Sequence, residues 1–254
     1  MKISVITAAY NSGGTIADAI KSLLIQTHTD MEQIIVDGGS TDGTCDIVAS
    51  FGDKIARFVS EPDGGIYDAM NKGIRLATGD VVGVLNSDDM YADENALARV
   101  AAAFENPEVD VCYGDLVYVS QGNIAKNVRV WKSSAYVPGR FLSGWVPPHP
   151  TFFVRRAVYE KHGLFDLSFP LAADFELMLR FLHCHKLKSS YIPATIMKMR
   201  LGGATNKSVG NIIRQNIEIF QAGRKNGVNL GARWFLGKSY DRFKQYMRAR
   251  KICG

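Results

Sequence analysis

Two adjacent carboxylates, Asp88 and Asp89, are the side chains whose types and spacing point most directly to chemistry. They end an apolar segment, residues 81–85, that has the composition of a buried strand. A strand that stops in acidic side chains places oxygen ligands at the carboxyl edge of a sheet, where open α/β folds bind their ligands. Because Mg²⁺ and Mn²⁺ prefer such ligands, the pair predicts a divalent-metal site with Asp89 as the direct ligand. The alternative is that one of the two carboxylates caps the next helix.

Polar loops follow the first two segments of strand composition. The first region contains Thr7, Tyr10 and Asn11, and the second begins with Asp37. Asp37 can accept hydrogen bonds from a ribose or a base, and the Tyr10 ring can stack on a base. The alternatives are turn chemistry for the Asp-Gly-Gly sequence and a core position for Tyr10. Neither loop carries the glycine motif of dinucleotide or P-loop sites, which excludes both classes.

A Pro-Asp-Gly-Gly turn at residues 62–65 leads into a predicted helix at residues 66–77. Asn71 and Lys72 follow Asp68 by three and four positions, so the three residues share one helix face. A lysine on this face can meet a phosphate as a point charge, and the alternative is an ordinary solvated face. The opposite face carries the apolar residues Ile66, Met70, Ile74 and Ala77.

Three further residues complete the candidate set. Asp174 opens a predicted helix and can act as a general base, since a carboxylate can take the proton of a hydroxyl that attacks a sugar carbon. The alternative for Asp174 is a helix cap. His149 lies in a Pro-Pro-His-Pro segment, and we expect it near a substrate or packed within its loop. Arg200 follows a predicted strand and can reach a diphosphate, or belongs only to a turn.

The elements that must position these residues change character at residue 108. Before it, strand and helix patterns alternate, which predicts parallel strands joined by right-handed crossovers. The predicted strands there are residues 3–8, 33–36, 55–59 and 81–85, and the predicted helices are 15–26, 45–50, 66–77 and 94–104. Later strands are predicted at 109–119, 124–131, 151–154 and 191–199, helices at 175–182 and 209–223, and a hairpin turn at 120–123.

Composition is that of a soluble globular protein, with 46% hydrophobic and 22% charged residues in a chain of 254. No apolar run approaches the roughly 18 residues that span a bilayer, and we expect the N-terminus to be a strand rather than a signal peptide. The four cysteines lack C-x-x-C spacing, which argues against a disulfide framework or zinc site and suits a reducing cytosol.

The formal charge of +5 is concentrated in residues 233–254, which contain seven basic side chains and one acidic side chain. The rest of the chain is close to neutral, which argues against a basic nucleic-acid-binding core. Within the tail, Leu236, Tyr240, Phe243 and Met247 recur at helical spacing. A basic amphipathic helix predicts binding to an anionic membrane surface. The alternative is a packed terminal helix with a solvated basic face.

Together these segments resemble the family-2 glycosyltransferases of the GT-A fold. The specific matches are residues 5–11, 35–44, 63–73 and 85–89, and looser ones follow at 149–153, 163–166 and 173–177. The resemblance implies an α/β fold in which a Rossmann-like, mostly parallel central sheet is flanked by helices. It implies a nucleotide-sugar-binding half at residues 1–108 and an acceptor-binding, catalytic-base half of the same domain at 109–205. C-terminal helices with the basic tail would occupy residues 206–254.

The same resemblance implies an inverting transferase with a nucleotide-diphosphate sugar donor and Mn²⁺ or Mg²⁺ on the diphosphate. Asp88 and Asp89 would hold the metal, Asp174 would be the catalytic base, and His149 would lie on the acceptor side. We expect a glycan or lipid-linked acceptor in cell-surface polysaccharide or glycolipid synthesis, and a cytoplasmic enzyme peripheral to the inner face of the membrane. The donor-binding set would be Thr7, Tyr10, Asn11, Asp37, Asp68, Asn71, Lys72, Asp88 and Arg200.

The sequence departs from the family pattern at two positions. Asn86 stands where the Asp-x-Asp motif begins, so Asp88 and Asp89 must hold the metal themselves. Ala173 stands where an acidic residue usually precedes the base. The Gln-x-x-Arg-Trp signature of processive synthases is absent, which predicts addition of one sugar rather than polymerisation.

Two other classes of protein remain as alternatives. A metal-dependent nucleotidyltransferase would need a basic, glycine-rich loop for a triphosphate, and residues 7–14 contain no Lys or Arg. A non-catalytic nucleotide-sugar-binding module would lack the metal and base carboxylates that this sequence has. The sequence leaves open whether the donor base is uracil or guanine, which sugar moves, and which hydroxyl receives it.

Overall fold

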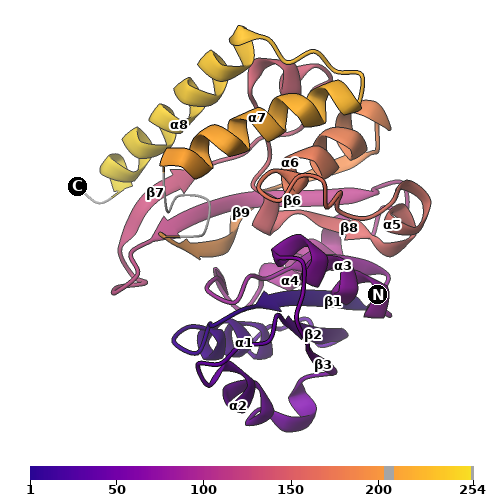
Figure 1. Ribbon diagram of the computed structural model, residues 1–254, viewed down its shortest axis with the longest axis vertical. Coiled ribbons are helices and arrows are strands. Elements are labelled where there is room, and N and C mark those ends of the chain that lie inside the picture. The colour runs from indigo at the N-terminus through magenta and orange to yellow at the C-terminus, as the bar shows by residue number, and fades with distance from the viewer. Residues whose placement is uncertain (203–208, 253–254) are drawn as a thin grey trace.

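A nine-stranded mixed sheet runs through the computed structural model, which describes residues 1–202 and 209–252 (Figure 1). The strand order is β3-β2-β1-β4-β8-β6-β9-β5, and β7 pairs with β6. The strands are β1 (Ile3–Ala9), β2 (Met31–Asp37), β3 (Arg57–Ser60), β4 (Val81–Val84), β5 (Met90–Tyr91), β6 (Val111–Val119), β7 (Asn127–Trp131), β8 (Phe153–Arg155) and β9 (Ser189–Arg200).

The four N-terminal strands are parallel, as the alternating pattern predicted. β1 pairs in parallel with β2 and β4, and β2 pairs in parallel with β3. Ala9 at the end of β1 lies opposite Asp37 at the end of β2, so both strands deliver their loops to one edge. The helices of this half are α1 (Ile16–Leu24), α2 (Thr44–Ala49), α3 (Ile66–Leu76) and α4 (Ala96–Ala103). They confirm the predicted helices, with boundaries shifted by at most two residues.

The second half is built on β6, which is antiparallel to β7 and β8 and parallel to β9. The predicted hairpin between β6 and β7 is therefore confirmed. Strand β5 and helix α5 (Arg156–His162) were not predicted, and β5, with two residues, is too short to carry a readable periodicity. Strand β5 directly follows Asp89, and helix α4 takes Asn95 as its N-cap. The helix-cap interpretation of Asp88 and Asp89 is therefore wrong.

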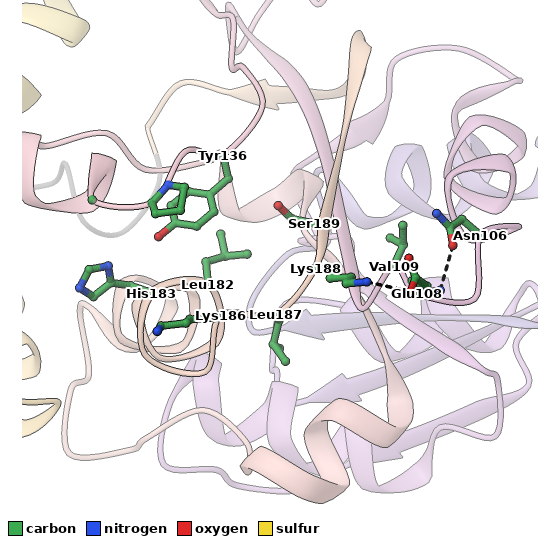
Figure 2. A pocket seen from close by; sticks show the side chains of 12 residues that line it. Asn106, Glu108, Val109, Tyr136, Leu182, His183, Lys186, Leu187, Lys188 and Ser189 are labelled. Atoms are coloured by element: carbon green, nitrogen blue, oxygen red, sulfur yellow. Dashed lines mark hydrogen bonds and ion pairs between the residues drawn. The ribbon is translucent and has the colours of Figure 1, made fainter.

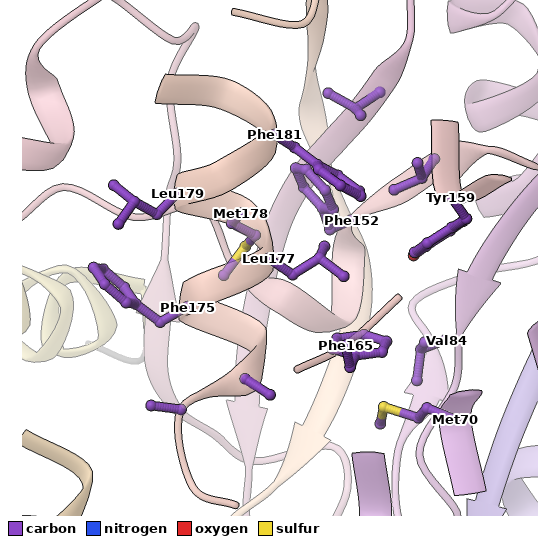
Figure 3. Close-up of a cluster of buried hydrophobic side chains, with 14 of the residues drawn as sticks. Met70, Val84, Phe152, Tyr159, Phe165, Phe175, Leu177, Met178, Leu179 and Phe181 are labelled. Atoms are coloured by element: carbon purple, nitrogen blue, oxygen red, sulfur yellow. The ribbon is translucent and has the colours of Figure 1, made fainter. Parts of the chain in front are cut away.

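The largest core contains side chains from both halves of the chain (Figure 3). Met70 of α3 and Val84 of β4 lie near Phe165, which precedes helix α6 (Ala173–Met178). Ile66 was predicted to face this core but is 47% exposed, because it is the first residue of α3. The neighbouring Tyr67 packs inward instead, with its ring 5.4 Å from that of Phe165.

The predicted helix at residues 175–182 is α6 followed by a π-helical turn, Leu179–Cys184. Arg180 donates hydrogen bonds to Glu176 Oε1 at 2.9 Å and to the Leu164 carbonyl oxygen at 2.7 Å. These bonds tie the helix to the segment before it, and π-turns of this kind interrupt the regular helical ladder. The hydrogen bonds of Arg180 therefore help to hold the first turn of α6, which contains Asp174, in place.

The last two helices, α7 (Val209–Lys225) and α8 (Ala232–Ile252), lie at the periphery of the molecule (Figure 1). Helix α8 lies along β7 and the 3₁₀ turn η2 (Arg140–Ser143). The approach to η2 is close, since a β-carbon added at Gly237 would lie 1.8 Å from the Ser143 carbonyl oxygen. No helix within residues 1–202 and 209–252 is long and apolar enough to cross a membrane.

Candidate active site

Asp37 ends β2 as a fully buried carboxylate that organises the loop after it. It accepts hydrogen bonds from the backbone N–H groups of Gly39 and Ser40, at 3.0 and 2.9 Å, and from the Ser60 hydroxyl at 2.8 Å. Burial opposes its ionisation, but the hydrogen bonds from Ser40, Ser60 and Cys45 outweigh burial and lower the pKa of Asp37. The turn chemistry predicted for the Asp-Gly-Gly sequence is therefore present, and a contact between Asp37 and a ribose or base stays a prediction.

The β1 loop presents Tyr10 and Asn11 beside this turn. Tyr10 is 66% exposed, so its predicted availability to a base holds and the core alternative is wrong. Asn11 adopts a left-handed backbone conformation, with φ 47°, and its Oδ1 accepts a hydrogen bond from the Thr41 N–H at 3.0 Å. Thr7 lies outside this group, because it is fully buried and its hydroxyl accepts a hydrogen bond from Gln33 at 3.1 Å. We therefore remove Thr7 from the donor-binding set.

Charged residues of α3 and of the segment before it hold the turn at residues 62–65 in place. Asp68 Oδ2 accepts a hydrogen bond from the Gly64 N–H at 3.0 Å, and Lys72 Nζ lies 2.8 Å from Glu61 Oε1 and 3.7 Å from Asp68. The hydrogen bond to Glu61 raises the pKa of Lys72, which stays a cation at this edge. Asp68 and Lys72 therefore remain candidates for donor contact.

Asn71 has a different role from the one that its helix face predicted. Its Nδ2 donates to the Phe165 carbonyl oxygen and its Oδ1 accepts from the Phe165 N–H, both at 2.9 Å. The side chain is 3% exposed. Both ends of the amide are engaged by one backbone position, so Asn71 fastens α3 to the segment before α6 and is not a donor-binding residue.

Arg200 is also committed to the protein itself. Its guanidinium donates to the Asp88 carbonyl oxygen at 2.9 Å and to Asp18 Oδ2 at 2.6 Å, and its side chain is 8% exposed. The Arg200 N–H lies 3.3 Å from Asp89 Oδ1. The predicted diphosphate contact is thus replaced by hydrogen bonds that join the end of β9 to α1 and to the loop after β4. This loop, residues 85–89, carries the predicted metal ligands and is called the metal loop below.

The two acidic residues of the metal loop have different environments. Asp89 is fully buried, and its second oxygen accepts a hydrogen bond from Asn86 Nδ2 at 2.8 Å. Burial, and then the charge of Asp88, raise the pKa of Asp89 well above its usual range. Asp88 is only half-buried. Asp88 is therefore the more accessible of the two carboxylates, and Asp89 as the direct metal ligand stays a prediction.

The loop nevertheless fits a divalent cation. The Oδ1 atom of Asn86 is buried and has no hydrogen-bond partner among the described residues. This amide oxygen and the Asp88 carboxylate are oxygen donors of the kind that Mg²⁺ and Mn²⁺ prefer, with water and substrate phosphate completing the shell. A cation here would also relieve the repulsion between Asp88 and Asp89. Residues 1–202 and 209–252 contain no group of three or more His, Cys, Asp and Glu side chains arranged to hold a metal.

Asp174 is half-buried in the first turn of α6, whose N-cap is Ala172, so the helix-cap alternative is wrong. The Tyr67 hydroxyl lies against its carboxylate, and burial together with the Asp174 charge raises the pKa of Tyr67 well above its usual value. Burial lowers the pKa of His149, against the opposing effect of Asp174, so His149 is neutral beside the carboxylate. Sequence reasoning missed Tyr67, although it lies within the matched segment 63–73.

Lys238 of α8 also reaches this region. Burial lowers the pKa of its ammonium to about 8, while the nearby Asp174 charge opposes that shift. Its Nζ lies 4.8 Å from the centre of the Trp234 ring, which in turn contacts the Phe175 ring at 5.6 Å. The C-terminal helix therefore contributes a cation to the surroundings of the candidate base.

A separate cavity of about 610 Å³ opens beside the start of β9 (Figure 2). Figure 2 shows Tyr136, His183 and Ser189 around it, with Lys188 paired to Glu108 at 2.8 Å. Its walls lie at the amino ends of β6 and β9, whereas the metal loop follows the carboxyl end of β4. The predicted ligands do not line this cavity, so it lies apart from the candidate site.

Comparison with known proteins decides the family. The family model for glycosyl transferase family 2 matches residues 4–165. The chain belongs to this family. This family-2 protein is 32% identical over 211 residues to the PGL/p-HBAD biosynthesis glycosyltransferase of Mycobacterium bovis (strain BCG / Pasteur 1173P2), covering 81% of this chain and 80% of the relative. An uncharacterized glycosyltransferase of Nostoc sp. is 33% identical over 173 residues, covering 63% and 53%.

Solved structures share the fold of the family-2 protein. TarS of S. aureus matches with a TM-score of 0.66 at 18% identity, over 98% of this chain and 43% of TarS. The mannosyltransferase PcManGT of Pyrobaculum calidifontis, in complex with GDP-Man and Mn²⁺, matches with a TM-score of 0.60 at 18% identity, over 98% of this chain and 73% of PcManGT. These likenesses confirm the predicted GT-A-type fold.

Proposed function

We propose that this protein is an inverting glycosyltransferase that moves one sugar from a nucleotide-diphosphate donor to a glycan or lipid-linked acceptor. The pathway would be cell-surface polysaccharide or glycolipid biosynthesis. The observation that carries the proposal is the contact between Asp174 and Tyr67, because the candidate base lies beside the turn–helix segment that was predicted to contact the donor. The neighbours TarS and PcManGT, solved with UDP-GlcNAc and GDP-Man, support a donor of this class.

In the proposed reaction, Asp174 accepts the proton of an acceptor hydroxyl as that oxygen forms a bond to the anomeric carbon of the donor. The bond from this carbon to the phosphate oxygen breaks, and the nucleoside diphosphate leaves. Attack opposite the leaving group inverts the configuration. A divalent cation at Asp88 and Asn86 would neutralise the developing charge of the diphosphate. Tyr10 would stack on the base, and neutral His149 would contact the acceptor.

The direct test is the Asp174→Asn variant with nucleotide sugars and Mn²⁺. We expect wild-type protein to release a nucleoside diphosphate, and the variant to bind the donor with a rate lowered by about 100-fold or more. NMR of the transferred sugar reports inversion at the anomeric carbon. Wild-type turnover in Asp174→Asn would overturn the role of the base. Release of pyrophosphate would indicate a nucleotidyltransferase, and binding without turnover a non-catalytic module.

Addition of a single sugar is tested by the length of the product. Mass spectrometry of acceptor incubated with excess donor should show one added residue, because the processive signature is absent from the sequence. A ladder of products would contradict this part of the proposal.

Helix α8 supports a position at an anionic membrane surface. Its exposed apolar residues are Leu236, Tyr240, Phe243 and Met247, which are 73%, 59%, 62% and 42% exposed. Its inward side is formed by Trp234 and Gln245, at 0% and 8% exposure. Helix α8 thus packs on the domain and still exposes an apolar stripe to solvent. In the alternative, a packed terminal helix with a solvated basic face, the apolar stripe would face the domain. Basic residues of the same helix complement anionic lipid headgroups, and we place the protein on the cytoplasmic face.

Co-sedimentation with liposomes tests this placement. We expect binding to vesicles that contain anionic lipid, little binding to zwitterionic vesicles, and loss of binding in Leu236→Ser/Phe243→Ser. Ile25→Ser is the matched control, because Ile25 is 62% exposed on the nucleotide half. If the double variant changes a dimer to a monomer and lipid binding is unaffected, a second copy covers the stripe and the membrane proposal is wrong.

A further inference from the structure

Two cations of α8, Lys238 and Arg242, lie in the electrostatic surroundings of the candidate site. Lys238 and Arg242 are four positions apart, so they lie on one face of the helix and act on each other electrostatically. Lys238 is within electrostatic reach of Asp174, and Arg242 is within reach of Tyr118, which in turn feels the charge of Asp89. Lys238 therefore lies near the candidate base, and Arg242 lies about one helical turn further along α8.

The position of this pair is fixed by close backbone packing. A β-carbon added at Gly144 would lie 2.4 Å from the Lys238 backbone nitrogen and 2.4 Å from the Trp234 carbonyl oxygen. Gly237 approaches Ser143 more closely still, since a β-carbon there would lie 1.8 Å from the Ser143 carbonyl oxygen. Because both contacts involve backbone atoms, α8 cannot shift along η2 without a clash, and Lys238 is held beside Asp174.

Among the described residues, Asp174 acts on Lys238 electrostatically but from beyond salt-bridge distance. Within the part of the chain that the structure describes, neither Lys238 nor Arg242 forms a salt bridge. The Lys238 ammonium instead lies over the Trp234 ring. Two like charges at this spacing destabilise a helix, and burial of Lys238 increases the cost. Such a pair suits a bound anion with several acceptor oxygens, as a phosphate provides.

We propose that Lys238 and Arg242 bind a phosphate of the acceptor while an acceptor hydroxyl reaches Asp174. The acceptor class would then be a lipid-linked saccharide that carries phosphate next to its lipid, since the same helix turns its apolar stripe outward. This inference rests on the proposed function and names the substrate class of the same site. The lipid would then stay at the outward, apolar side of α8, and the phosphate would reach the inward side that carries Lys238.

The test uses the full chain and farnesyl phosphate in EDTA, so that a metal-dependent diphosphate site does not contribute. Binding is followed by tryptophan fluorescence, because Lys238 lies 4.8 Å from the Trp234 ring. We expect Lys238→Met and Arg242→Met each to weaken binding by about tenfold or more. Arg224→Met, which removes an exposed cation of α7, is the matched control and should bind within about twofold of wild type.

Titrations with farnesol and with inorganic phosphate show whether the lipid or the phosphate alone accounts for the affinity for farnesyl phosphate. Both should bind at least about tenfold more weakly than farnesyl phosphate. Equal binding of farnesol, or of inorganic phosphate, would overturn the proposal, as would unchanged binding in both cation variants. Arg242 is exposed, so Arg242→Met remains informative if Lys238→Met does not fold.

UDP and GDP titrations separate this inference from a role on the donor. Loss of nucleoside-diphosphate affinity in the two variants, with farnesyl phosphate binding intact, would overturn the acceptor assignment. Donor turnover by the wild-type protein is measured independently. Absence of that turnover would contradict the proposed function, whereas the lipid-phosphate titrations report on Lys238 and Arg242 alone.

Discussion

The hydroxyl of Tyr67 lies within hydrogen-bonding reach of the carboxylate of Asp174, and this contact joins helix α3 of the N-terminal half to helix α6 of the second half. The Tyr67 ring is held by stacking on Phe165 at 5.4 Å, and Asn71 of the same helix binds the Phe165 backbone. The orientation of the candidate base therefore depends on the same segment that was predicted to contact the donor.

Tyr67→Phe should lower kcat by roughly 10- to 100-fold and leave the donor KM nearly unchanged, because misplacement of a base costs rate rather than donor affinity. The phenyl ring keeps the stacking on Phe165, so the fold should persist. Steady-state kinetics provide the measurement. Tyr159→Phe is the control, since Tyr159 is another buried tyrosine whose contacts are with Phe181 and Arg180. Equal losses in both variants would point to a general packing effect.

Asn71→Ala should reduce stability by about 2–4 kcal/mol, because it leaves the buried N–H and C=O groups of Phe165 without their partners. Urea denaturation followed by circular dichroism measures the change. Donor affinity at a temperature where the variant is folded should stay close to that of wild type. A stable variant with weakened donor binding would restore Asn71 to the donor-binding set.

The stability of the Asn86→Asp variant should depend more strongly on bound metal than the stability of wild type does. The substitution removes the hydrogen bond from Asn86 Nδ2 to Asp89 and adds a third carboxylate beside Asp88 and Asp89. Without metal the stability should fall by about 1–3 kcal/mol, and Mn²⁺ should raise the Tm of the variant more than that of wild type. Thermal melts with EDTA and with Mn²⁺ measure both effects. An equal Mn²⁺ response in the two proteins would argue against an ion near Asn86.

The lowered pKa of Glu32 predicts that the folded protein loses stability in acid. Burial opposes its ionisation, but hydrogen bonds from Lys2, Ser4 and Thr78 outweigh burial and lower its pKa from 4.5 to about 2. A lowered carboxyl pKa contributes stability above the unfolded value, and that contribution is lost as pH falls from about 4.5 toward 2. After allowance for solvent screening, the contribution is about 1–2 kcal/mol.

Urea titrations of wild type and Glu32→Gln across this pH range check the prediction. The stability difference between the two proteins should be largest above pH 5 and should shrink below it. Ser50→Ala serves as the control, since the Ser50 hydroxyl bonds only a local carbonyl oxygen, that of Ile47. A difference that does not change with pH would contradict the linkage.

The parallel half was predictable because its strands and helices carry strong periodic patterns. The site was predictable only as a set of candidates. Asp88 and Asp89 are identical in type, and their difference in burial arises from strand β5 and the backbone of Arg200, which lie far apart in the sequence. Asn71 and Arg200 resemble ligands by type, but each is engaged by a partner that no local pattern reveals, Phe165 and Asp18.

Tyr67, in contrast, does not resemble a ligand in the sequence, yet it lies beside the candidate base in the structure. A tyrosine in the first turn of an amphipathic helix is ordinary in sequence, and its neighbour Ile66 fitted the apolar stripe better. Its importance comes from Asp174, a residue in the other half of the chain. Long-range contacts of this kind determine which candidate residues form the site.

The close contact between Gly237 and Ser143 has a consequence for the length of acceptor that the protein can use. If α8 lies in a membrane surface, the rigid contact fixes the height of Asp174 above the lipid at about one helix diameter, roughly 10 Å. Only hydroxyls within the first one or two sugars of a lipid-linked chain lie at that height. The enzyme would therefore act early in assembly, and longer chains would move beyond its reach as they grow.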